Sequence, residues 1–184
     1  YVQGAERSGK THTGVYIATE LTKEGLYPQL LDGAELSEEL VSDVVERSKF
    51  GKGLFIVDNF QSFYEGLEGR ASGLFVNFGE QLINQSSALV IFGKPSIEEV
   101  SEKVDEHIMS RLLPGAGYIM GNPEDDEIGE LINCIAHQRG MNLSDRKLRY
   151  IEKRISRSVA EIDSYFQRVE YLARVLDSPI SLAL

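Results

Sequence analysis

Eight residues near the start of the chain have the spacing of a phosphate-binding loop. The motif reads G-x-x-x-x-G-K-T and consists of Gly4, Ala5, Glu6, Arg7, Ser8, Gly9, Lys10 and Thr11. The two glycines let consecutive backbone N–H groups surround a phosphate that side chains would otherwise crowd. In this motif the lysine reaches the β- and γ-phosphates, and the threonine hydroxyl is placed for Mg²⁺. The stretch therefore predicts a nucleoside phosphate site, to which Thr13 in the following helix is assigned as well. A chance match in a glycine-rich turn is the alternative.

An aspartate at the end of an apolar run is the predicted partner of this loop. Residues 54–57 are all apolar and are followed directly by Asp58. Such a run is typical of a parallel strand that is buried on both faces. Because ligands of open α/β sheets bind outside the carboxyl ends of the strands, we expect Asp58 to face Thr11 and to hold Mg²⁺, usually through water. An aspartate that merely ends a strand is the alternative.

The elements that must position these residues alternate between strands and helices over the first two thirds of the chain. Apolar runs predict strands at 1–3, 28–32, 54–58 and 88–92, and helical spacing predicts helices at 13–23, 38–47, 74–83 and 97–112. This alternation implies a parallel α/β sheet. From residue 123 onward only helical patterns occur, the last of them at 159–176. We therefore predict a nucleotide-binding α/β core at 1–122 and an all-helical subdomain at 123–184.

Composition excludes several classes of protein. A hydrophobic content of 42% and a charged content of 26% are ordinary for a globular protein of 184 residues. No run approaches the ~18 apolar residues of a membrane span, and the single Cys134 favours a reducing, cytoplasmic setting. The net charge of −10 disfavours broad binding to nucleic acid. From residue 124 onward, however, 9 Lys and Arg nearly balance 11 Asp and Glu. A solvated helix surface explains these cations, and an anionic partner is the alternative.

Six stretches resemble the DnaA replication-initiator family of AAA+ ATPases. They are the start of the loop helix, the predicted magnesium strand, a Ser-Arg-Leu segment, a turn, the last helices and the domain exit: residues 11–13, 55–61, 107–112, 138–145, 151–162 and 178–182. The resemblance covers nearly the whole chain. It implies a P-loop NTPase fold of the AAA+ type in which residues 123–184 form the helical lid. It also implies ADP or ATP with Mg²⁺ as the bound cofactors.

Within this family the chain is most similar to the Hda-type regulatory inactivators of DnaA. Asp58 is followed by Asn59, as in that group, and the stretch that resembles the domain exit is not followed by the DNA-binding domain of the initiator. The resemblance implies that the protein is loaded on the DNA polymerase sliding clamp and promotes hydrolysis of the ATP held by the DnaA initiator. Arg111 stands where the family has an arginine finger, a residue that stabilises the transferring phosphoryl group. A surface arginine at a helix end is the alternative.

The same resemblance sets the remaining expectations about partners and location. It predicts a cytoplasmic protein at the nucleoid or replisome, without sequence-specific DNA binding or membrane contact. A homo-oligomer is possible. The chain begins at Tyr1, so a clamp-binding segment is expected upstream of it.

Three positions depart from the family's hydrolytic pattern. Asn59 replaces a second acid, Gly93 offers no polar side chain at the end of its strand, and Ala160 replaces a lid arginine. We therefore expect weak or absent ATP hydrolysis and binding of ADP at least as tight as that of ATP. The alternatives are the AAA+ core of an initiator ATPase without its DNA-binding domain, and a nucleotide-binding adaptor.

Overall fold

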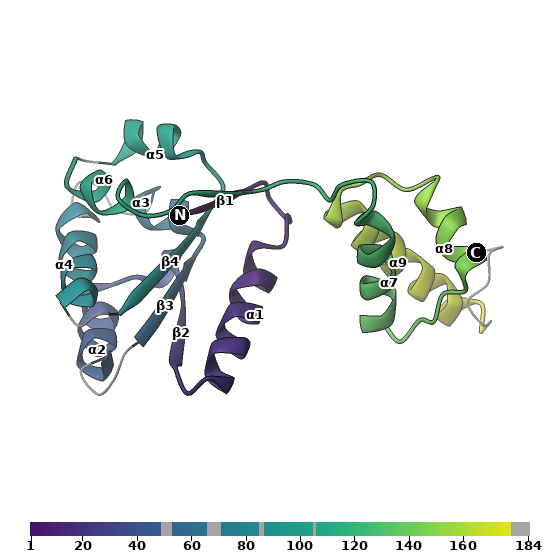
Figure 1. The fold of residues 1–184 in the computed structure, drawn as a ribbon, viewed down its shortest axis with the longest axis horizontal. Helices are drawn as coiled ribbons and strands as arrows, with labels where there is room; N and C mark the ends of the chain where they lie inside the picture. The colour runs from purple at the N-terminus through teal and green to yellow at the C-terminus, as the bar shows by residue number, and fades with distance from the viewer. Residues whose placement is uncertain (49–52, 66–70, 85–86, 105, 178–184) are drawn as a thin grey trace. The chain divides into compact units, whose positions relative to one another are not determined.

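The chain consists of two compact units. The computed structural model describes residues 1–48, 53–65, 71–84, 87–104 and 106–177 (Figure 1). The first unit is Tyr1–Met120 and the second is Gly121–Leu184. Among the described helices, none has the length and apolar character needed to cross a membrane.

A five-stranded parallel sheet forms the centre of the first unit. Its strands are β1 (Val2–Gly4), β2 (Tyr27–Asp32), β3 (Gly53–Asp58), β4 (Ala88–Gly93) and β5 (Tyr118–Met120). They are arranged in the order β2-β3-β4-β1-β5, and each neighbouring pair is parallel. The predicted parallel α/β fold class is confirmed. Because all strands run the same way, their carboxyl ends meet at one edge of the sheet.

Helices cover both faces of this sheet (Figure 1). The helices of the unit are α1 (Lys10–Lys23), α2 (Glu38–Ser48), α3 (Phe60–Glu65), α4 (Ala71–Asn84), α5 (Ile97–Lys103) and α6 (Glu106–Leu112), with a 3-10 turn, η1, at Gly33–Glu35. Leu54 and Ile56 of β3 pack with apolar residues of α1, whereas Phe55 and Val57 belong to the larger core on the other face. Burial on both faces explains why the strand is apolar without alternation.

A glycine sets the distance between α1 and the sheet. Gly14 is buried, and a Cβ atom at this position would lie 3.3 Å from both Ile56 Cγ2 and Phe92 Cε2. A side chain here would therefore push α1, and the loop at its start, away from β3.

The described part of the second unit, residues 121–177, contains three helices around a core of its own. They are α7 (Ile128–Gln138), α8 (Asp145–Glu152) and α9 (Val159–Val175). Ile132 and Phe166 are among its most buried side chains. Gly140, at φ 71°, follows the end of α7, where a left-handed residue commonly ends a helix. Arg139 fastens this end to α9 by ion pairs of 2.6 Å to Asp163 and 3.2 Å to Glu170.

The predicted single helix at 97–112 is wrong. The structure has two helices, because α5 ends at Lys103 and Val104 adopts an extended backbone with φ −112° and ψ 155°. Val100 and Ile108 are buried in the same core, so the apolar spacing continues across the break and conceals it. Two short elements, α3 and β5, were not predicted. Tyr118 and Ile119 of β5 are both exposed, so this strand has no burial pattern to reveal it.

We expect Gly14→Val to destabilise the first unit by about 1–3 kcal/mol, because the added atoms overpack the contact of α1 with Ile56 and Phe92. Urea unfolding measures this change. Gly73→Val is the matched control, since Gly73 lies in α4 and a Cβ atom added there would meet no atom within 4 Å. The control should change stability by less than about 0.5 kcal/mol. Equal effects at the two positions would contradict this account of the packing.

Candidate nucleotide-binding site

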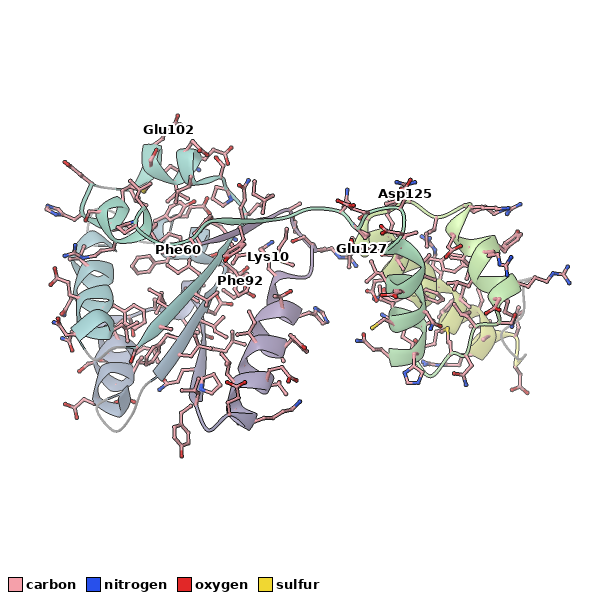
Figure 2. The ribbon with its side chains drawn as sticks, in the orientation of Figure 1. Lys10, Phe60, Phe92, Glu102, Asp125 and Glu127 are labelled. Carbon is pink, nitrogen blue, oxygen red and sulfur yellow. The ribbon has the colours of Figure 1, made fainter. Side chains whose placement is uncertain are left out.

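The predicted phosphate-binding loop connects β1 to α1, and Lys10 folds back over it. Lys10 is only 8% exposed, and its Nζ donates hydrogen bonds to Gly4 O at 2.9 Å and Ala5 O at 2.6 Å (Figure 2). Burial lowers the pKa of Lys10, and the charges of Asp58 and Glu6 oppose this effect. The lysine thus carries a charge that the loop's own carbonyls satisfy in part.

Two residues of the loop have a left-handed backbone conformation. Gly9 has φ 97° and caps the start of α1, and Arg7 is also left-handed at φ 59°. Ser8 Oγ is buried without a hydrogen-bond partner in the described part of the chain. Glu6 and Arg7 are exposed, whereas Thr13 is half-buried in the first turn of α1. A positive helix end beside exposed loop residues and an unsatisfied hydroxyl fits an anionic phosphate group.

Thr11 and Asp58 meet although they lie 47 positions apart in the sequence. The Thr11 hydroxyl donates a hydrogen bond to Asp58 Oδ2, and Asp58 Oδ1 accepts another from Asn59 N at 2.9 Å. Asp58 is 6% exposed. A hydroxyl and a carboxylate are oxygen ligands suited to Mg²⁺, which otherwise keeps water and phosphate oxygens in its shell. In the described residues no group of three or more His, Cys, Asp or Glu side chains could hold a metal by itself.

A second carboxylate stands at the same edge of the sheet, and the sequence reasoning missed it. Asp32 ends β2 and is the register partner of Asp58. Its Oδ2 accepts a hydrogen bond from Asn59 Nδ2 at 3.2 Å, and its Oδ1 accepts one from Ala34 N at 2.9 Å. The Asn59 side chain therefore contacts a carboxylate, that of Asp32. The signal was available, since residues 30–32 repeat the pattern of an apolar strand that ends in aspartate.

The sequence showed only that Gly93 offers no polar side chain at the end of β4, whereas the structure places another residue beside it. The space beside Gly93 is filled by the Tyr1 phenol, whose oxygen an added Cβ would overlap. Tyr1 OH donates to Pro95 O at 2.8 Å, and burial raises the pKa of this phenol. A side chain at residue 93 is thereby excluded.

Lys94 follows directly after β4 and places a cation at this end of the strand. The sequence did not indicate this residue as part of the site. Its Nζ lies 3.8 Å from Glu6 Oε2 in the loop, and its charge further lowers the pKa of Lys10. β4 is the neighbour of β1 in the sheet, so the residue after β4 is close to the loop that follows β1. Lys94 therefore weakens the argument that Gly93 gave for expecting ADP to bind as tightly as ATP.

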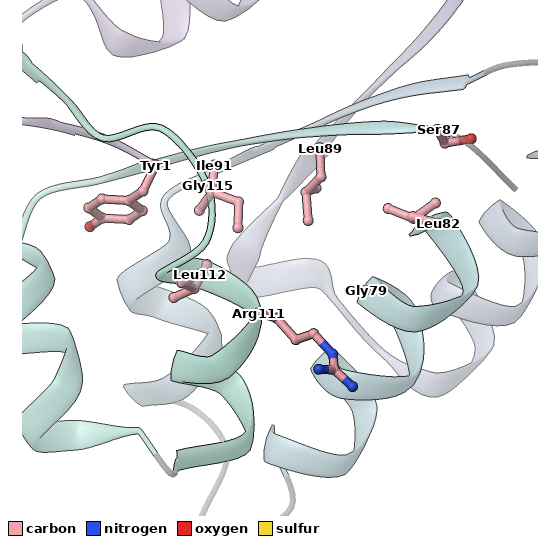
Figure 3. Close-up of a pocket in the computed structure, with 9 residues that line it drawn as sticks. All are labelled: Tyr1, Gly79, Leu82, Ser87, Leu89, Ile91, Arg111, Leu112 and Gly115. Atoms are coloured by element: carbon pink, nitrogen blue, oxygen red, sulfur yellow. The ribbon is translucent and has the colours of Figure 1, made fainter. Parts of the chain in front are cut away.

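Arg111 lies in a different environment from the loop. Its guanidinium, on α6, forms an ion pair with Glu80 on α4, and its side chain is 34% exposed. Arg111 also borders a cavity of about 150 Å³ (Figure 3). The other lining residues are mostly apolar: Tyr1, Gly79, Leu82, Ser87, Leu89, Ile91, Leu112 and Gly115. None of the predicted loop residues lines this cavity, so the structure does not bring Arg111 into one site with them.

The sheet order, the helices on both faces and the loop between β1 and α1 define a class: the fold is that of the AAA+ P-loop NTPases. Solved structures with this fold include domain III of the replication initiation protein DnaA from Thermotoga maritima, with a TM-score of 0.76 and 14% identity over 99% of this chain and 79% of that chain. The replication initiator DnaA bound to AMPPCP and single-stranded DNA gives 0.70 and 16%, over 96% of this chain and 57% of that one. The Thermotoga maritima RuvB Holliday junction branch migration motor gives 0.68 and 17%, over 98% and 57%.

At these identities the likeness shows the fold alone. The chain spans little more than half of the longer DnaA and RuvB chains that it matches. No protein-family model matches the sequence, and a search of curated proteins found no match.

We expect Asp58→Asn to weaken binding of ATP in the presence of Mg²⁺ by at least about tenfold, because the amide loses the charge that attracts the ion. Binding of ADP in EDTA should change by less than about threefold. Calorimetry with and without Mg²⁺ measures both. Asp126→Asn, an exposed acid of the second unit, is the control. An Asp58→Asn protein that keeps the full effect of Mg²⁺ would contradict the assignment.

We expect Lys94→Gln to weaken binding of ATP by about five- to tenfold and of ADP by less, because the additional phosphate carries the additional charge. Lys103→Gln is a closely matched control: Lys103 is similarly exposed and lies 3.9 Å from a carboxylate, that of Glu65, as Lys94 lies 3.8 Å from that of Glu6. Titrations of both variants with ATP and with ADP measure these changes in affinity. If both variants lose the same affinity, Lys94 has no special role.

Proposed function

We propose that this protein is an Hda-like AAA+ regulator of chromosomal replication initiation that binds ADP or ATP with Mg²⁺. The observation that carries the nucleotide part is the convergence of Lys10, Thr11 and Asp58 at the carboxyl edge of the sheet. Two similar solved structures, both of DnaA, are described as bound to AMPPCP. This supports a nucleotide as the ligand of the same fold here.

Each residue of the site has a distinct task in this proposal. The loop N–H groups and the N-terminus of α1 hold the phosphates, and Lys10 exchanges the carbonyls of Gly4 and Ala5 for phosphate oxygens. Thr11 and Asp58 hold Mg²⁺, which when bound neutralises phosphate charge. Asp32 keeps Asn59 in place beside Asp58.

The regulatory part of the proposal rests on Arg111. We propose that this arginine reaches the ATP bound to a neighbouring DnaA molecule, while the protein is loaded on the sliding clamp in the cytoplasm. Its position outside the loop's surroundings supports action on a partner's nucleotide rather than on its own. The ion pair with Glu80 neutralises Arg111 in the free chain, and the partner's phosphates would replace that carboxylate. Arginines in such roles accelerate hydrolysis by about 10³–10⁵ in GTPases.

Weak hydrolysis at the protein's own site is part of the same proposal. Asn59 places an amide where the family has an acid, and Ala160, in the first turn of α9, offers no cation. A site that holds nucleotide without turning it over suits a regulator. No sequence-specific DNA contact is needed for this function.

We expect Arg111→Ala to reduce the stimulation of DnaA ATP hydrolysis by at least about a hundredfold, because the developing phosphoryl charge loses its cation. The assay measures phosphate release by DnaA with clamp-loaded DNA, with and without this protein. Arg174→Ala is the control, since Arg174 is also an exposed arginine paired with a carboxylate, that of Glu170 at 2.9 Å. Undiminished stimulation by the Arg111→Ala protein would show that this mechanism is wrong.

The alternative is the AAA+ core of an initiator ATPase, with which the fold shared with DnaA domain III is equally consistent. An initiator core would hydrolyse ATP itself, and Lys10→Met would abolish that turnover. Turnover sensitive to Lys10→Met therefore favours the initiator. Nucleotide binding without turnover and without any effect on DnaA would favour an adaptor.

A further inference from the structure

One exposed face of α8 carries a stripe of cations with an aromatic ring among them. Arg146, Arg149, Tyr150 and Lys153 follow the spacing i, i+3, i+4 and i+7, which places them on one side of a helix. Ile151, on the opposite side, is buried in the core of the second unit. All four stripe residues are exposed, and nitrogen-tipped side chains stand out from this helix in Figure 2.

The charge of this stripe is not neutralised by the described part of the chain. No ion pair joins Arg146, Arg149 or Lys153 to any described residue, whereas Arg139, Arg157 and Arg174 of the same unit all pair with carboxylates. Residues 145–157 contain six of the chain's 19 Lys and Arg residues and only two acids. A local excess of cations in a protein of net charge −10 concentrates attraction for anions at one place.

Tyr150 adds a second kind of contact to the stripe. Its side chain is 42% exposed although the guanidinium of Arg154 lies 3.9 Å from the ring centroid. The hydrogen bond from Arg154 Nη1 to the backbone carbonyl of Tyr150 keeps the guanidinium at this end of the helix, where its cation–π contact lies against one face of the ring. An exposed aromatic ring beside cations without an ion pair is the combination on which bases stack while their phosphates are neutralised.

We propose that this stripe, defined by Arg146, Arg149, Tyr150 and Lys153, binds single-stranded nucleic acid without sequence preference. The three cations, which span about 10 Å along the helix, contact successive phosphates, and a base packs against Tyr150. An acidic protein segment would match the charge but would make no use of the ring, so nucleic acid fits both observations. This surface goes beyond the proposed nucleotide site and does not rest on it.

Fluorescence anisotropy with a labelled 20-nucleotide oligo-dT, and with oligo-U of the same length, tests the proposal. We expect binding of at least one of the two at low salt, with an affinity that falls steeply as salt rises. Replacing Arg146, Arg149 and Lys153 together by Gln should weaken binding at least about tenfold and reduce the log–log salt slope by about 2, since each phosphate contact contributes about 0.7. Tyr150→Leu should weaken binding about fivefold or more and leave the salt slope unchanged.

The control removes the same total charge from exposed positions elsewhere. Lys23, Lys103 and Arg168 replaced together by Gln should change the affinity by less than about twofold. Thermal unfolding shows that each variant folds. An equal loss in this control, or binding of neither oligonucleotide, would overturn the proposal. Competition by polyglutamate as effective as that by unlabelled oligo-dT would also overturn it and assign the stripe to acidic proteins.

Discussion

The contact between the Thr11 hydroxyl and the Asp58 carboxylate is the point on which the arrangement of the site depends. It joins the first turn of α1 to the end of β3, and so fixes the loop relative to the sheet. Two features of the fold make it possible. The parallel register aligns the ends of neighbouring strands, and Gly14 lets α1 lie close to Ile56 and Phe92. A shift of α1 by the thickness of one methyl group would separate the two oxygens.

Lys10, Arg111 and the cations of the α8 stripe differ in the groups that they contact in the free chain. Those groups are what a ligand must replace. Lys10 is bonded to backbone carbonyls, which a phosphate oxygen replaces with a stronger, charge-assisted bond. Arg111 is paired with Glu80, so a partner must displace a carboxylate. The cations of the α8 stripe have no such partner to lose among the described residues. Binding there is accordingly the least specific and the most sensitive to salt.

The sequence predicted the parts of this structure that depend on local pattern. The apolar runs located β2, β3 and β4, and helical spacing located most of the helices. The loop motif and Asp58 were found because each has a recognisable spacing. Those signals are properties of neighbouring residues, and secondary structure follows from them directly.

The residues that were missed are those whose role depends on strand order. Lys94 and Asp32 lie at the site only because β4 is next to β1 and β2 is next to β3, which no local pattern specifies. The role of Gly93 depends on Tyr1, 92 positions away in the sequence, which fills the space beside it. The division between α5 and α6 was hidden because the apolar residues on both sides face one core. Contacts across the sheet therefore decide the chemistry of the site.

Binding of nucleotide at the Lys10, Thr11 and Asp58 edge is the central claim, and calorimetric titration of the chain with Mg²⁺ and ATP or ADP tests it most directly. The account predicts saturable binding of one nucleotide per chain with a dissociation constant below about 1 mM, weakened by removal of Mg²⁺. The absence of saturable binding of either nucleotide in this range would contradict it.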